Sequence, residues 1–439
     1  MAAPQTAGDI SPGLLKVMER AKRDPSTRFR SLAHLLDIDA LRRAYGKLRA
    51  DAAVGVDGVS KEDYGIDLEQ RLEQLHQKLR TGQYQHQPIL QVLIPKDDGR
   101  KRPIGISATE DKIVEGALSE LLGAIYEQDF LNCPYGFRPH RSAHDAIRSL
   151  NEAIYRGQVN VILEADIRSF FDSIDRKMLM EMLQERVVDG ALLRLIGKCL
   201  NVGILHGGEL SFPEEGTAQG SSLSPLLGNI YLHYVLDVWF EREVKPRLRG
   251  AATLIRYADD FVIGFERHDD AERVQRVLGK LLGRYGLTLH PNKTRLIAFE
   301  RPAVSQRDGT GASTFDFLGF TFYWRRTRRG WWMMGCKTRH ARVRRTLQSI
   351  AEWCRGHRHL PVRAQHAALT RRLVGHFNYF GVNGNFRSLA GVVDVTQRLW
   401  FKWLRRRSQR TRLTGERYGH LLARFPLPRP RITVRLWAD

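Results

Sequence analysis

Three aspartates follow or separate short apolar runs in this chain. Asp166 ends a run of valine, isoleucine and leucine, and Asp259 and Asp260 stand between two further apolar runs. Carboxylates at the ends of neighbouring strands can converge, because paired strands lie about 5 Å apart. Two divalent ions shared by such carboxylates, about 4 Å apart, can activate a hydroxyl and neutralise a leaving pyrophosphate. Oxygen ligands and phosphate chemistry favour Mg²⁺ over zinc.

The same aspartates also have an ordinary interpretation, since aspartate is common in solvated turns. The elements that would have to position them are predicted strands at 159–163, 254–257 and 261–265, the last two forming a β-hairpin. Taken alone, these residues do not decide between a solvated turn and a metal site.

Positive charge is concentrated at one end of the chain. The 439 residues carry a net charge of +22, with 27 basic and 4 acidic residues from Arg325 onward and 43 basic and 44 acidic residues before it. Tryptophan, tyrosine and phenylalanine are interleaved with these arginines. Such a surface suits phosphate contacts and base stacking. We therefore expect a nucleic-acid-binding protein with a mixed α+β body, followed by basic helices near 338–356, 362–380 and 387–408.

Composition excludes several other classes. At 42% hydrophobic and 27% charged residues, the chain is neither collagen-like nor disordered, and no apolar run is long enough to span a membrane. No secretory signal is recognisable. Four scattered cysteines form no CxxC pair, which predicts isolated thiols in a reducing compartment.

Eight motifs occur in a fixed order and carry a family resemblance. They are Gly55–Val59 (GVDGV), Arg102–Ile106 (RPIGI), Tyr135–Pro139 (YGFRP), Ala165–Asp172 (ADIRSFFD), Gln219–Pro225 (QGSSLSP), Arg256–Phe261 (RYADDF), Leu289–Thr294 (LHPNKT) and Phe315–Phe320 (FDFLGF). With them the chain resembles the reverse transcriptases of bacterial group II introns, from about Phe29 to about Ile432.

The resemblance implies roles for individual residues. Asp166 and Asp259 match the metal ligands, Asp260 the third acidic position, and Ile167 is expected as a further metal ligand. Phe171 matches the residue that stacks under the incoming sugar and excludes a ribose 2′-hydroxyl. The other expected nucleotide-binding residues are Lys96, Arg102 and Gln219, and the expected primer and template contacts are Tyr257, Ala258, Lys293 and Gly319.

Ordinary alternatives remain for several of these residues. They are core packing for Phe171, a solvated basic hairpin for Lys96 and Arg102, and a loop glutamine that bonds the backbone for Gln219. The chain also has Ala218-Gln219-Gly220-Ser221 where the family usually has Pro-Gln-Gly-Gly, a departure expected to alter loop stiffness.

The basic last quarter corresponds, in the resemblance, to an RNA-gripping thumb or maturase domain. Phe377 and Tyr379 are expected to pack helices together. Adjacent arginines cannot all be buried, so RNA contact is expected from Arg405, Arg406, Arg407 and Arg410. The endonuclease domain that often ends the family, with its paired cysteines, is not expected.

The resemblance predicts a right-hand polymerase of α+β fingers and palm followed by an all-α thumb. The expected segments are 1–28 (N-terminal segment), 29–90 (extension of the fingers), 91–324 (fingers and palm), 325–404 (thumb) and 405–439 (basic nucleic-acid-binding tail).

The expected activity is RNA-directed DNA synthesis on a primer, with two Mg²⁺ ions that Mn²⁺ can replace. Expected partners are an RNA template, a DNA or RNA primer, deoxynucleoside triphosphates and a group II intron RNA, in the bacterial cytoplasm near the nucleoid. Two alternatives stay open: a domesticated enzyme of DNA repair or phage defence, and a protein that acts mainly as an RNA-binding splicing factor.

Overall fold

The computed structural model describes residues 10–95, 101–156, 159–213, 215–217, 220–303, 313–327, 329–408 and 413–437. They form a mixed α and β structure with two compact units, each built from three separated stretches of chain. Unit 1 comprises Met1–Ser142, Ala165–Ile263 and Asp269–Arg295, and unit 2 comprises Ala143–Glu164, Gly264–His268 and Leu296–Asp439.

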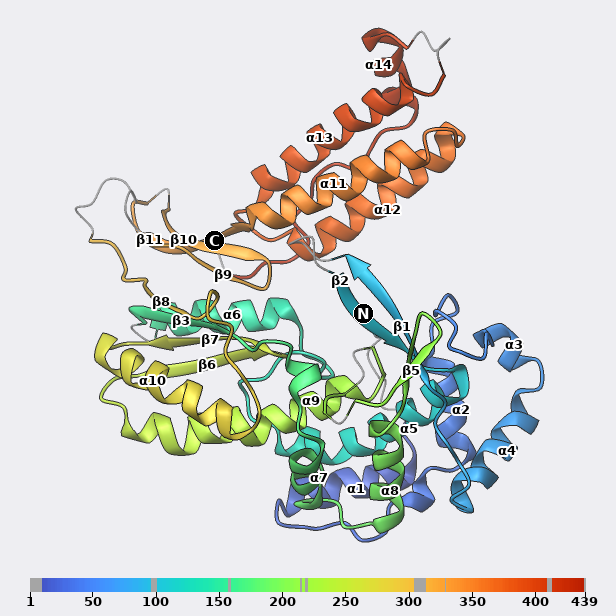
Figure 1. Cartoon of the computed structure of the whole chain (residues 1–439). Coiled ribbons are helices and arrows are strands. Elements are labelled where there is room, and N and C mark those ends of the chain that lie inside the picture. Colours follow the sequence, from blue (N-terminus) through green and yellow to red (C-terminus); the bar gives the residue numbers. More distant parts are fainter. Residues whose placement is uncertain are drawn as a thin grey trace. The chain divides into compact units, whose positions relative to one another are not determined.

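Unit 1 is rich in helices, and the long helix α5 (Thr109–Asp129) is largely buried in it (Figure 1). Helix α1 (Pro12–Arg23) begins with residues that favour a helix start, because the Ser11 hydroxyl accepts the Leu14 N–H and Pro12 occupies the first turn. The other helices are α2 (Ile38–Lys47), α3 (Lys61–Gly65), α4 (Leu68–Arg80), α7 (Arg176–Gln184), α8 (Gly190–Leu200), α9 (Ser224–Leu232) and α10 (His268–Arg284).

Helix α9 does not end in the usual way. It continues into two π-helical segments, η3 (His233–Asp237) and η4 (Phe240–Val244), and then into the 3₁₀ turn η5 (Lys245–Arg247). π-Helical turns are rare and often mark functional sites.

Two four-stranded sheets contain all or part of the RPIGI, ADIRSFFD and RYADDF motifs. The first, here called the palm sheet, has the order β6-β7-β3-β8 and consists of β6 (Ala252–Tyr257), β7 (Asp260–Phe265), β3 (Val161–Asp166) and β8 (Arg295–Ala298). The second, the finger sheet, has the order β2-β1-β4-β5 and consists of β2 (Lys101–Ile106), β1 (Ile89–Pro95), β4 (Ile204–His206) and β5 (Glu209–Ser211). The predicted strands and the predicted hairpin are therefore present.

Unit 2 contains helix α6 (Ala143–Arg156) and a three-stranded sheet of order β11-β10-β9. Phe299, Phe315 and Trp324 form its aromatic core, with Phe299 stacked on Trp324 at a centroid distance of 5.2 Å. The strands are β9 (Phe315–Phe317), β10 (Phe320–Arg326) and β11 (Trp332–Thr338), and the helices that follow are α11 (His340–Gly356), α12 (Val362–Phe380), α13 (Phe386–Leu404) and α14 (Gly415–Arg424).

Strand β11 corrects one prediction. The segment 325–404 is not all α, because the apolar run from Trp332 to Cys336 pairs with β10 along its whole length. The three predicted basic helices follow it, and they lie side by side as α11, α12 and α13 (Figure 1). Phe377 is fully buried among them, as expected.

The end of the chain folds back onto this helical part. The Thr433 and Val434 N–H groups donate to the Gly381 carbonyl, and the Leu436 N–H donates to Asn383 Oδ1. Residues 431–437 therefore pack against the end of α12 through backbone bonds.

Two general expectations can be checked in the described part of the chain. None of its helices is long and apolar enough to cross a membrane. The four cysteines (Cys133, Cys199, Cys336 and Cys354) are free thiols, and burial raises the pKa of each.

Candidate active site

Asp166 is the last residue of the buried strand β3. Its backbone carbonyl accepts the His290 N–H at 2.8 Å, and Ile167 pairs with Leu289 in an isolated antiparallel bridge. The LHPNKT motif therefore runs beside the end of β3. Ile167 itself is buried.

The positively charged side chain of Lys293 lies beside the Asp166 carboxylate. The turn at 290–294 is closed by the Lys293 and Thr294 N–H groups, which both donate to the His290 carbonyl. This turn brings Lys293 Nζ to 2.6 Å from Asp166 Oδ2, in an ion pair whose lysine is 59% exposed and whose aspartate is 24% exposed. Lys293, expected to touch primer or template, here balances the charge of Asp166.

Asp259 lies at the same end of the palm sheet. The Asn160 N–H donates to the Phe265 carbonyl, so the start of β3 lies beside the end of β7. The end of β3, at Asp166, therefore lies beside the start of β7 and the turn that contains Asp259. Ala258 and Asp259 are the two residues of this turn, and Ala258 has φ +57°, a left-handed conformation that is rare outside glycine. The strand end that carries Asp166 and the turn that carries Asp259 therefore lie side by side, as predicted.

The charges around Asp259 interact. Burial raises the pKa of the Asp259 carboxyl, and the negative charge of Asp166 raises it further, whereas the positive charges of Arg102 and Lys293 lower it. Arg102 comes from the edge strand β2 of the finger sheet, where it pairs with Ile94. Two carboxylates and two cationic side chains thus act on one another.

The YGFRP motif supports the turn of Ala258 and Asp259, called the catalytic turn below because of the expected role of Asp259. The Tyr135 N–H donates to the Arg256 carbonyl, and the Phe137 and Tyr257 rings lie 6.4 Å apart. A Cβ on Gly136 would lie only 2.5 Å from the backbone nitrogen of Ala258. Gly136 is therefore needed for this close approach of two backbones.

Phe171 follows Asp166 by five residues and lies in the 3₁₀ turn η2 (Phe170–Ser173). Its ring packs on Phe170 at 5.1 Å, and its carbonyl accepts the Thr217 N–H at 2.7 Å. Arg176 fixes the same loop, because its guanidinium donates to the carbonyls of Pro213 and Gly216. Phe171 is half-buried, which leaves part of its ring accessible.

The loop that leads into helix α9 is held by a hydrogen bond to Glu115 of helix α5. The Ser222 N–H donates to Glu115 Oε2 at 2.8 Å, and the other Glu115 oxygen accepts the Ser107 hydroxyl and lies 3.0 Å from His86 Nε2. Burial lowers the pKa of His86, but the hydrogen bond to Glu115 and the nearby negative charges outweigh it, so that the pKa is raised. Helix α5 thereby connects the loop to the finger sheet.

Not every expected residue can be placed at this site. Lys96, Ala218, Gln219 and Arg410 lie outside the described residues. Gly319, Arg405, Arg406 and Arg407 belong to unit 2, whereas the aspartates, Arg102, Phe171, Tyr257 and Lys293 belong to unit 1.

Within unit 2, Gly319 forms a tight turn. Leu318 and Gly319 both have positive φ, +50° and +80°, as a two-residue type I′ hairpin requires. The Tyr379 hydroxyl donates to the Leu318 carbonyl at 2.9 Å, so Tyr379 also fixes this turn besides packing helices.

Arg405, Arg406 and Arg407, which follow α13, are exposed, as expected, but they also have structural contacts. Arg405 lies over Phe401 and Arg406 over Trp403, while Arg407 donates to the carbonyls between α11 and α12. The guanidinium faces that could meet a phosphate are thus partly fixed by the fold.

Sequence reasoning missed a buried pair beside the catalytic turn, Arg256 and Asp237. Both side chains are fully buried, and they form an ion pair with a distance of 2.5 Å. A signal was available: an arginine inside a strand of apolar residues and an aspartate on an apolar helix each need a partner.

A sheet with carboxylates from two strand ends at one end is the arrangement expected for the palm of a right-hand nucleic-acid polymerase. Residues 94–322 match the family of reverse transcriptases, the RNA-dependent DNA polymerases. The chain belongs to this family.

Three relatives illustrate its position. Protein YkfC of Escherichia coli is 32% identical over 359 residues, 73% of this chain and 90% of that protein. The group II intron-encoded protein LtrA of Lactococcus lactis subsp. cremoris is 31% identical over 257 residues, 57% of this chain and 41% of LtrA. An uncharacterized 91 kDa protein in the cob intron of Schizosaccharomyces pombe is 36% identical over 208 residues, 47% of this chain and 25% of that protein.

Proposed function

We propose that this chain copies RNA into DNA in the manner of group II intron reverse transcriptases, by adding deoxynucleotides to a primer 3′-hydroxyl with two Mg²⁺ ions. One observation carries the proposal. Asp166 and Asp259 lie at one end of the palm sheet, where Lys293 pairs with Asp166 and the charges of Asp166, Lys293 and Arg102 act on Asp259. Asp260, the first residue of β7, adds a third acidic residue there.

The donor set fits a divalent ion of the magnesium type. In the described part of the chain, no three His, Cys, Asp or Glu side chains are grouped so as to hold an ion by themselves. Mg²⁺ commonly takes only one or two carboxylates and completes its shell with water and substrate phosphates. The Asp166 carboxylate forms an ion pair with the Lys293 ammonium at 2.6 Å, so it lies beside a positive charge in this structure. The Ile167 carbonyl is the proposed additional ligand.

When bound, the ions would activate the primer hydroxyl and stabilise the charge on the leaving pyrophosphate. The protein residues bind and orient. Arg102 offers a cation to the triphosphate, and a guanidinium can bind two phosphate oxygens at once. Phe171 is proposed to lie under the sugar and to exclude a 2′-hydroxyl, while Tyr257 and Ala258 contact the primer end.

The test is primer extension on an RNA template by the Asp259→Ala variant. We expect extension to be abolished and RNA affinity to be almost unchanged, because the substitution removes one carboxylate and no basic residue. Asp67→Asn is the matched control, since Asp67 is exposed and makes no capping hydrogen bond. Extension retained by Asp259→Ala would refute the metal assignment.

A second function, binding of an intron RNA, is favoured by the charge of the last quarter of the chain. Its 27 basic and 4 acidic residues exceed what solubility requires, and the matched proteins include an intron-encoded one and one located in an intron. We propose 325–404 as the thumb or maturase segment and 405–439, including Arg410, as a further RNA-binding segment. The proposed location remains the bacterial cytoplasm.

Sequencing of the RNA that co-purifies with the protein at moderate salt would test this second function. One dominant intron RNA would support the maturase role. A diverse pool, or a small dedicated RNA, would indicate a polymerase that serves repair or defence.

A further inference from the structure

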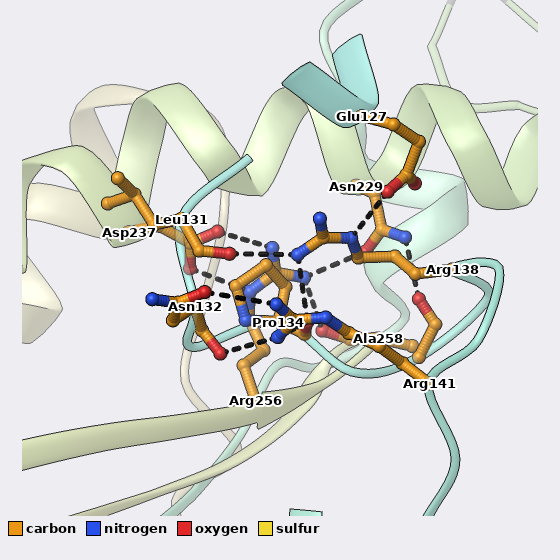
Figure 2. A network of polar contacts seen from close by, with 11 residues as sticks. Glu127, Leu131, Asn132, Pro134, Arg138, Arg141, Asn229, Asp237, Arg256 and Ala258 are labelled. Carbon is orange, nitrogen blue, oxygen red and sulfur yellow. Dashed lines mark hydrogen bonds and ion pairs between the residues drawn. The ribbon is translucent and has the colours of Figure 1, made fainter. Parts of the chain in front are cut away.

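The turn that carries Asp259 is held by a buried arginine three residues earlier. Arg256 is fully buried in strand β6, and its guanidinium makes four hydrogen bonds (Figure 2). Nε and Nη2 donate to the two Asp237 oxygens at 2.8 and 2.5 Å, and Nη1 donates to Asn229 Oδ1 and to the Ala258 carbonyl, both at 3.0 Å. The last bond reaches the residue next to Asp259.

The two acceptors come from one continuous helical segment. Asn229 lies in α9 and Asp237 ends the π-helical segment η3. Two α-helical turns take about seven residues, so the eighth residue would point away by roughly 80°. A π-turn takes up one additional residue, and this brings Asp237 back toward the face of Asn229. The unusual helix therefore aims both side chains at Arg256.

A second connection runs from the same helix to the other side of the turn. Asn229 Nδ2 donates to the Gly136 carbonyl at 2.7 Å, and Gly136 is the residue whose backbone touches Ala258. Arg138 holds the neighbouring segment by donating to the Pro134 carbonyl (Figure 2). The catalytic turn is thus fixed both from inside the strand and from the YGFRP segment.

We propose that Arg256 is a positioning residue for polymerisation, with Asp237 and Asn229 as the groups that hold it. The left-handed Ala258 is a strained conformation for a residue with a side chain, and it persists only where surrounding contacts enforce it. The bond from Arg256 to the Ala258 carbonyl is such a contact. It fixes the backbone from which the Asp259 carboxylate projects. Arg256 is fully buried, so it acts through Asp259.

This inference rests on the proposed role of Asp259, but it can fail separately. The key variant replaces the whole pair, Arg256→Met with Asp237→Leu. Exchanging a buried ion pair for apolar residues of similar volume often leaves stability unchanged or raised, whereas removing one partner leaves a buried charge. The double variant therefore removes the tether while leaving the core packed.

Four quantities would be measured for the double variant. We expect an unfolding temperature near that of the wild type and an unchanged Kd for primer–template. We also expect kcat to fall about 10- to 100-fold, because misplacement by about 1 Å costs about that much. Hydrogen–deuterium exchange of the peptide covering 257–261, measured on the protein alone, should become faster.

The matched control is Arg186→Met with Asp129→Leu. This pair is also nearly buried in unit 1, with Nε to Oδ2 at 2.8 Å, but neither residue bonds the catalytic turn. Its kcat and its exchange at 257–261 should equal those of the wild type. If kcat of the control variant falls as much as kcat of the Arg256 double variant, the effect is general destabilisation and the proposal is overturned.

Arg256→Lys provides a second test if the double variant does not fold. Lysine keeps the positive charge beside Asp237 but lacks the planar fork, so it cannot bond Asp237, Asn229 and the Ala258 carbonyl together. We expect a folded protein with reduced kcat. Wild-type kcat in a folded Arg256→Lys variant, or in a folded double variant, would overturn the proposal. Activity in Asp259→Ala would instead overturn the proposed function, and the exchange measurement would still report on the tether.

Discussion

Replacing Gly136 by alanine should displace the catalytic turn without altering any of the proposed catalytic side chains. The new Cβ would lie 2.5 Å from the Ala258 nitrogen and 3.0 Å from the Tyr257 carbonyl carbon, whereas ordinary contacts begin near 3.4 Å. The two backbones must therefore separate by about 0.9 Å. Both contacts are with backbone atoms, so no side chain can rotate to relieve them. A misplacement of about 1 Å can cost about 100-fold in rate, which is the loss we expect here.

The assay is single-turnover primer extension on an RNA template, with Kd for primer–template measured in parallel. Gly123→Ala is the control, since a Cβ on Gly123 meets open space in the middle of helix α5. Alanine in a helix interior is more stable than glycine by about 0.5–1 kcal/mol, so this control should be active and slightly more stable.

Three results are informative. A rate loss of about 100-fold with unchanged Kd would support the reasoning. A wild-type rate in a folded Gly136→Ala variant would refute it, because the turn would then tolerate the displacement. A rise in Kd by the same factor as the fall in rate would show that the motif acts through primer binding.

Two further predictions concern selectivity and pH. Phe171→Ala should admit ribonucleotides in a primer-extension assay with mixed substrates, because it removes the ring proposed to exclude a 2′-hydroxyl; unchanged discrimination would remove that role. Burial, helped by the positive charges of Arg256 and Arg242, lowers the pKa of His233 to about 4. The unfolded chain therefore binds the proton more tightly than the folded protein does. As the pH falls from about 6.5 to about 4, protonation of His233 should lower the free energy of unfolding by up to about 3 kcal/mol. Denaturant unfolding of His233→Leu should show a flatter acid dependence over that range, and equal slopes for both proteins would contradict the assignment.

Local patterns made much of the site predictable from the sequence. The strand that ends at Asp166 and the hairpin around Asp259 are short apolar runs with turns, so their geometry follows from neighbouring residues. The ordered motifs add which strand ends belong together. The start of α1 was equally predictable, because Ser11 and Pro12 act within one helical turn.

Long-range features were not predictable in this way. Asp237 reaches Arg256 only because the helix widens into a π-turn, and no local propensity signals that turn. Strand β11 was missed because its basic surroundings resemble those of the following helices. The return of residues 431–437 to Gly381 depends on contacts some fifty residues apart. Composition alone suggests binding to nucleic acid for that tail, and this role remains a prediction.

The discontinuity of unit 2 has a consequence for biosynthesis. Helix α6 belongs to this unit, and its partners are made much later: His144 Nε2 lies 2.7 Å from the Tyr379 carbonyl, and Arg148 Nε donates to the Arg435 carbonyl, 287 residues further along the chain. At about 5–20 residues per second, a ribosome needs about 15–60 s to cover that separation. During this time α6, whose buried face includes Ile147 and Leu150, lacks its contacts with Tyr379 and Arg435. The contacts of α6 with residues 379 and 435 can therefore form only after most of the chain has been made.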